Sequence, residues 1–178
     1  RMSEKNGIEV HLNYINLPDV IPYVKGGPLD KNIQGVAEVA SVLRTNAGQV
    51  QDMAKKMRKP ALLALNHPQW RHWDIQPQNL IDTPEIRFFE LCNGGSSFAP
   101  HPDAVSHTLD KFWDVVNSFR CKNGDPLVYG IGSDDTHTYF KDGAPLGAEA
   151  FYGWVMVRSD SLTNESVLDA MGRGDFYT

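Results

Sequence analysis

Three short, largely apolar runs most strongly constrain how this chain of 178 residues can fold. They are Ala61–Leu65, Ile86–Leu91 and Leu127–Ile131, and polar side chains follow each of them. Apolar runs of this length are typical of strands that are buried on both faces, as in a parallel sheet. Residues 8–17 are rich in β-forming side chains and predict a strand before these three. Phe151–Val157 predicts another strand after them.

Helical patterns lie between these strands. Residues 47–58 carry apolar side chains at helical spacing, and Pro60 ends the pattern. Residues 106–120 predict a second amphipathic helix, with one face formed by Leu109, Phe112, Trp113, Val116 and Phe119. Residues 164–171 predict a short last helix, and residues 18–35, rich in proline and glycine, predict a long loop. The alternation of buried strands and amphipathic helices predicts an α/β fold with a largely parallel sheet.

Composition excludes several other classes of protein. The chain is 41% hydrophobic and 22% charged, which is ordinary for a globular domain, and residues 1–178 are expected to form a single domain. It has no apolar run long enough to cross a membrane, so no membrane partner is expected. Its net charge of −5 lacks the broad basic footprint of a nucleic-acid-binding protein. Nucleic acid is therefore not expected as a partner.

Cysteine content and the first residues leave the compartment open. Cys92 and Cys121 permit one disulfide, and two reduced, buried thiols are an equal alternative. No apolar segment follows Arg1–Lys5, so this start is not a signal peptide, although a leader could precede Arg1. The protein is therefore expected to be cytoplasmic or, if a leader has been removed, periplasmic or secreted.

Histidines and carboxylates gather directly after the predicted strands. Asn66-His67-Pro68 follows the first apolar run, and Asp134-Asp135-Thr136-His137 comes shortly after the third. Glu9 and His11 lie in the first predicted strand. Since ligands of α/β sheets collect at the carboxyl ends of the strands, these side chains are candidates for one site.

The Asp135-Thr136-His137 unit is the most informative of these motifs. On extended backbone, Asp135 and His137 point to the same side, so both can bind one divalent cation. Zinc, manganese and iron all accept a mixture of carboxylate and imidazole ligands. Asp134 could orient a metal-binding imidazole by accepting a hydrogen bond from its other ring nitrogen. His67 and His11 strengthen the prediction of a metal site, and an ordinary turn is the structural alternative.

The ordered set of motifs resembles the polymerase and histidinol phosphatase (PHP) superfamily over about residues 7 to 178. The Gly-Ser-Asp-Asp-Thr-His unit at 132–137 is similar to the last metal-binding motif of that family, and Asn66-His67-Pro68 to its His-Pro motif. Residues 86–93, which include Glu90 and Asn93, are similar to the segment between them. His11-Leu12-Asn13 resembles the family's His-x-Asn unit, and residues 172–178 its terminal glycine and aromatic stretch.

The resemblance implies an α/β fold of the distorted (β/α)7 barrel type and a metal-dependent phosphoesterase. It implies up to three divalent ions, bound here by His11, His67, Asp135, His137 and Glu9, with Asp135 and His137 as the catalytic pair. The substrate would be a small phosphorylated molecule. Among the polar residues near these positions, Asn66, Arg71 and Asn93 are candidates for substrate contact.

One departure from the family pattern has consequences for the fold. No His-x-His motif precedes His11, so the chain is expected to be the C-terminal majority of such a barrel, without its first strands. The exposed sheet edges would then need a cover, which predicts a homo-oligomer or a missing N-terminal segment. The alternatives are an amidohydrolase-like barrel and a non-catalytic scaffold or ligand-binding module with a degenerate metal site.

Overall fold

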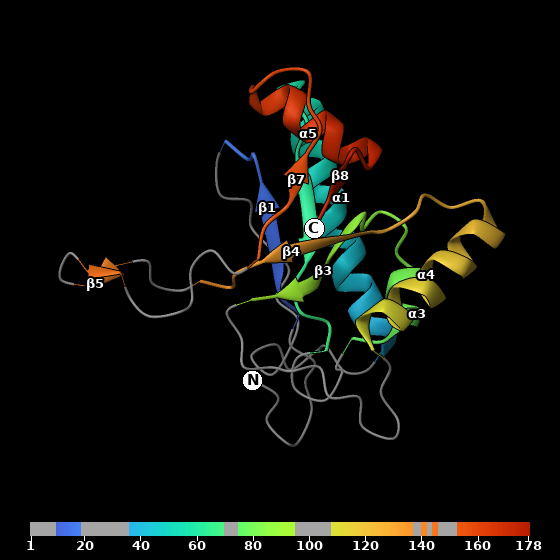
Figure 1. Ribbon diagram of the computed structural model, residues 1–178. Coiled ribbons are helices and arrows are strands. Elements are labelled where there is room, and N and C mark those ends of the chain that lie inside the picture. Colours follow the sequence, from blue (N-terminus) through green and yellow to red (C-terminus); the bar gives the residue numbers. More distant parts are fainter. Residues whose placement is uncertain are drawn as a thin grey trace.

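A four-stranded open sheet forms the centre of the molecule (Figure 1). The computed structural model describes residues 10–18, 36–69, 75–94, 108–136, 140–141, 144–145 and 153–178, with no side-chain description for 36–38, 140–141 and 144–145. The sheet order is β1 (Leu12–Ile15), β2 (Leu62–Leu65), β3 (Phe88–Asn93) and β4 (Tyr129–Ser133). β1 is antiparallel to β2, whereas β2, β3 and β4 are parallel.

Helices and two short ribbons complete the described elements. The helices are α1 (Val36–Met57), α3 (Pro77–Ile81), α4 (Leu109–Asn123) and α5 (Asn164–Arg173). One antiparallel ribbon pairs β5 (Phe140–Lys141) with β6 (Ala144–Pro145), and the other pairs β7 (Met156–Val157) with β8 (Phe176–Tyr177). The Thr163 side chain accepts a hydrogen bond from the Ser166 backbone N–H, so α5 begins with a side-chain cap.

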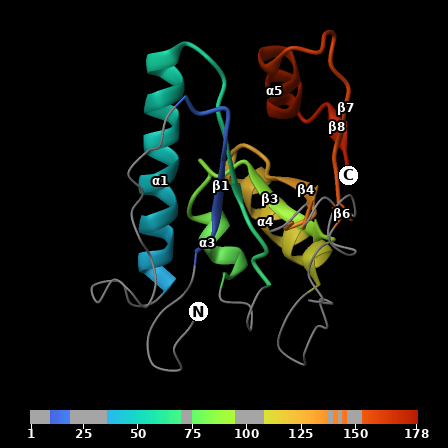
Figure 2. The ribbon, with the colours of Figure 1, turned by 90° about the vertical axis from the view of Figure 1, so that its left-hand side faces the viewer.

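The sheet separates two apolar layers, because successive residues of a strand point to opposite faces. On one face, Leu65 of β2 and Phe89 of β3 pack in a core with α1, α3 and α4. On the other face, Ala64 and Phe88 pack with α5 and the β7–β8 ribbon. Figure 2 shows α1 and α5 on opposite sides of the sheet. Burial on both faces explains why these strands read as continuous apolar runs.

The prediction of a distorted seven-stranded barrel lacking its first strands is wrong. Among the described residues, the parallel strands are β2, β3 and β4, and the sheet stays open between β1 and β4. β1 joins the sheet in the antiparallel sense, which the repeated parallel pairing of a β/α barrel does not allow. The prediction of an α/β fold is confirmed, and the parallel part of its sheet lies where the apolar runs predicted it.

Several local predictions also need correction. The helix predicted over residues 47–58 is the second half of the longer α1. Of the strand predicted over 151–157, residues 151–152 lie outside the described residues, and Met156–Val157 form β7 within the described part. Phe119, predicted on the buried face of its helix, is 49% exposed, and Arg120 is fully buried in its place. Cys92 and Cys121 are both free and exposed, so neither a disulfide nor a pair of buried thiols is present.

Two helix-ending glycines give a matched test of how tightly α5 packs on the sheet. Gly174 and Gly124 both adopt left-handed conformations, with φ of 83° and 76°. A Cβ on Gly174 would lie 2.6 Å from the Tyr129 ring, whereas nothing lies within 4 Å of one on Gly124. We expect Gly124→Ala to cost about 1 kcal/mol of unfolding free energy, from conformation alone. Gly174→Ala should cost about 1–3 kcal/mol more, from the added steric overlap. Urea unfolding curves would measure both, and equal losses would contradict the packing argument.

Candidate functional site

Sheet topology brings the polar motifs to one edge. The carboxyl ends of β2, β3 and β4 lie together because these strands are parallel. β1 is antiparallel to β2 and pairs Leu12 with Leu65, so the start of β1 lies beside the end of β2. The backbone N–H of Asn66 donates to the carbonyl oxygen of His11 at 3.0 Å and extends this pairing by one residue.

Two histidines distant in sequence meet at this edge. Nδ1 of His11 lies 3.2 Å from Nε2 of His67. The two rings are nearly perpendicular, with an interplanar angle of 80° and centroids 4.9 Å apart. His67 is buried, whereas His11 is exposed, so the pair spans the boundary between the protein interior and solvent. The sequence predicted both residues as metal ligands, and the structure brings them together.

Glu90 lies inside β3 and joins the ends of two neighbouring strands. Its side chain is 2% exposed. Oε2 accepts hydrogen bonds from the backbone N–H of His67 at 2.7 Å and from the Asn93 amide at 3.2 Å. Oε1 accepts a hydrogen bond from the Ser133 hydroxyl at the end of β4. A buried carboxylate is stable only with such partners, and here they fix the backbone that carries His67.

The end of β4 is also held by two further hydrogen bonds. Gly94 donates its backbone N–H to the Ser133 carbonyl oxygen at 2.7 Å. The Asp134 carboxylate accepts the backbone N–H of Gly153. Asp135 follows with a φ of 51°, a left-handed conformation that is uncommon outside glycine. The chain therefore turns sharply at the residue that the sequence predicts as a ligand.

The predicted site residues are placed only in part. His11, His67 and Asn66 lie at the junction of β1 and β2, and Asn93 contacts Glu90. Asp135 lies just beyond β4. Three predicted site residues, Glu9, Arg71 and His137, lie outside the described residues. Within the described part of the chain, no three histidine, cysteine or acidic side chains are close enough to form a metal-binding group.

Glu90 and Ser133 also belong to this cluster, although neither was predicted as a site residue from the sequence. One signal could have found Glu90, because it is an acidic residue within the apolar run Ile86–Leu91. A charged side chain in a strand buried on both faces needs polar partners, and these come from the ends of the adjacent strands. Ser133 offered no comparable signal, since serine is common at any strand end.

Comparison with protein-family models, curated proteins and solved structures gives no match to this chain. The resemblance to the PHP superfamily therefore stays a prediction. No helix among the described residues combines the length and the apolar character needed to span a membrane.

Proposed function

We propose that this protein is a metal-dependent hydrolase whose substrates are phosphoesters. The observation that carries the proposal is the meeting of His11 Nδ1 and His67 Nε2 at the carboxyl edge of the sheet, 3.2 Å apart. Two nitrogen ligands of one zinc ion, each at about 2.0 Å in tetrahedral geometry, are about 3.3 Å apart. The separation in this pair therefore fits one shared cation as well as an N–H···N hydrogen bond.

The donor set would hold zinc, manganese or iron. His11 and His67 would supply imidazole nitrogens, and Asp135, which follows β4, would supply a carboxylate. Glu9 and His137 are the candidates for further ligands of a di- or trinuclear centre. This mixture of nitrogen and oxygen donors suits all three metals.

The chain's own residues would orient the reaction. A bound cation supplies a water molecule that ionises near neutral pH and neutralises charge on the phosphoryl oxygens. Glu90 would keep His67 in position, because it binds the His67 backbone N–H. Asn66, Asn93 and Arg71 would contact the small phosphorylated substrate, since amide and guanidinium groups donate hydrogen bonds to phosphoryl oxygens.

The second candidate is a non-catalytic scaffold or ligand-binding module. It is favoured by the lack of a metal-binding group of three or more side chains among the described residues. A hydrolase needs ligands from Glu9 or His137 to complete its centre, whereas a binding module needs none. Measurement of bound metal separates the two functions.

Metal content of the full chain, purified without chelator, tests the proposal. We expect at least one equivalent of zinc, manganese or iron per chain. His11→Ala and His67→Ala should each reduce bound metal and the hydrolysis of p-nitrophenyl phosphate, because each removes a ligand. His101→Ala is the matched control, since the sequence places His101 away from the strand ends, and it should keep both properties.

Two results of the metal measurement would contradict the proposal. A wild-type chain that stays metal-free after incubation with all three ions would overturn the hydrolase proposal and favour the binding module. Metal that remains in both histidine variants at the wild-type level would place the ion elsewhere.

A further inference from the structure

The outer face of the β7–β8 ribbon carries a cluster of exposed apolar side chains. Trp154, Met156 and Tyr177 are 59%, 49% and 70% exposed. Their neighbours Val157 and Phe176 point the other way and pack against the core. A cluster of large apolar side chains on a protein surface is typical of an interaction site rather than of a bare surface.

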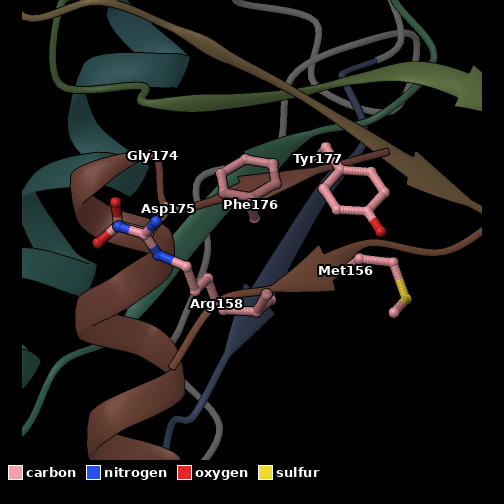
Figure 3. A pocket seen from close by; sticks show the side chains of 7 residues that line it. Met156, Arg158, Gly174, Asp175, Phe176 and Tyr177 are labelled. Atoms are coloured by element: carbon pink, nitrogen blue, oxygen red, sulfur yellow. The ribbon is translucent and has the colours of Figure 1, made fainter. Parts of the chain in front are cut away.

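The same face also carries a cation, Arg158, and an anion, Asp175, at directly opposite positions at the ends of the two strands. Met156 pairs with Tyr177 in the ribbon, and the Arg158 backbone N–H donates to the carbonyl oxygen of Asp175 at 2.8 Å. Side chains at every second position of a strand share a face. Arg158, the residue after β7, therefore shares this face with Met156, and Asp175, the residue before β8, shares it with Tyr177. Together they border a hollow of about 540 Å³ (Figure 3).

We propose that two copies of this chain associate face to face through the β7–β8 ribbon. A two-fold axis parallel to the strands would set β7 of one copy over β8 of the other, with both strands keeping their direction. Met156 would then face the partner's Tyr177, and Arg158 would face the partner's Asp175. Each contact occurs twice, as an isologous interface requires. The hollow provides room for side chains of the two faces to interdigitate.

Charge argues for a second copy as the occupant. A partner surface of one sign would be attracted by only one member of the in-register pair, Arg158 or Asp175. A surface that carries an anion opposite Arg158 and a cation opposite Asp175 would pair with both residues. A second copy of the ribbon, related by the two-fold axis, presents these two charges at this spacing. Asp175 already accepts a hydrogen bond from Arg173 through Oδ2 at 2.9 Å, which leaves Oδ1 for a second cation. None of these residues belongs to the candidate metal site, so the proposal does not depend on the hydrolase function.

Sedimentation velocity of the full chain over a range of concentrations tests the interface. The wild type should sediment as a dimer that weakens as salt is raised. Arg158→Glu would set carboxylates of the two copies against each other, so it should raise the dimer dissociation constant by about tenfold or more. The double variant Arg158→Glu/Asp175→Arg exchanges the charges and should restore the dimer. Met156→Lys should weaken it, because it places a charge in the apolar contact.

Leu162→Ser is the matched control, since Leu162 is 99% exposed and lies on the segment between the ribbon and α5. It should leave association unchanged. Circular dichroism would verify that every variant keeps the wild-type fold. A wild type that is monomeric at all concentrations would overturn the proposal, as would a dimer that Arg158→Glu leaves intact or one that the charge exchange fails to restore.

Discussion

Replacement of Arg120 by alanine should lower the free energy of unfolding by about 3–5 kcal/mol, because it removes a buried cation whose partners stay behind. Arg120 lies on α4 and is fully buried. Nη1 donates to the carbonyl oxygens of Ile86 at 3.0 Å and Pro126 at 3.1 Å. Nη2 donates to those of Leu80 at 2.6 Å and Thr83 at 3.0 Å. One guanidinium thus joins α3 and the segment after it, the residues that lead into β3, and the turn before β4.

Desolvation by burial, together with the nearby positive charge of Arg87, lowers the pKa of Arg120 to about 10, although the carboxylates of Asp125 and Glu85 oppose this shift. The side chain stays charged at neutral pH, so its four hydrogen bonds are charge-assisted and stronger than neutral ones. Without them, four carbonyl groups would lose their guanidinium partner beside a newly formed cavity.

Urea or thermal unfolding would measure the loss. Arg120→Lys should retain part of the stability, because a lysine ammonium group carries the charge but cannot span four acceptors with a planar fork. Lys122→Ala, an exposed position on the same helix, should change stability by less than about 0.5 kcal/mol. A wild-type midpoint for Arg120→Ala would contradict the bridging role.

Replacement of Glu90 by leucine should cost about 3 kcal/mol or more, since it would leave three donors without their acceptor in a buried site. Those donors are the His67 backbone N–H, the Asn93 amide and the Ser133 hydroxyl. Glu90→Gln is the informative companion. Its amide oxygen can accept from His67 and Asn93, and its amide nitrogen can donate to the Ser133 hydroxyl. We therefore expect Glu90→Gln to cost only about 1 kcal/mol.

Glu90→Leu and Glu90→Gln together separate the effect of the lost hydrogen bonds on stability from the effect of the lost charge on metal affinity. If a cation binds the histidine pair, Glu90→Gln should lower metal affinity by about 10- to 100-fold, because it removes the negative charge that contacts the His67 backbone. Its stability should stay close to that of the wild type. Calorimetric metal titration and urea unfolding would give the two numbers. Glu85→Leu is the control, since its side chain is 31% exposed and lies 3.9 Å from Arg44. Equal stability of Glu90→Leu and Glu85→Leu would contradict the structural role of Glu90.

Sequence patterns located the candidate site better than they described it. Histidines that lie within or directly after predicted strands were predicted to converge, and His11 and His67 do so. Their contact depends on β1 entering the sheet antiparallel to β2, which no local pattern specifies. Ser133 meets Glu90 only because β3 and β4 pair in parallel with a register shift between Glu90 and Cys92.

The sequence by itself determined the α/β class, the positions of β2, β3 and β4, the helices α4 and α5, and the second half of α1. These follow from apolar periodicity, which acts over a few neighbouring residues. Only the tertiary structure decided that the sheet stays open, that Arg120 is buried while Phe119 is exposed, and that Glu90 joins two strand ends. In each case the deciding partners lie far away along the chain. Local spacing can predict that a side chain needs a partner, but the fold alone selects which partner it meets.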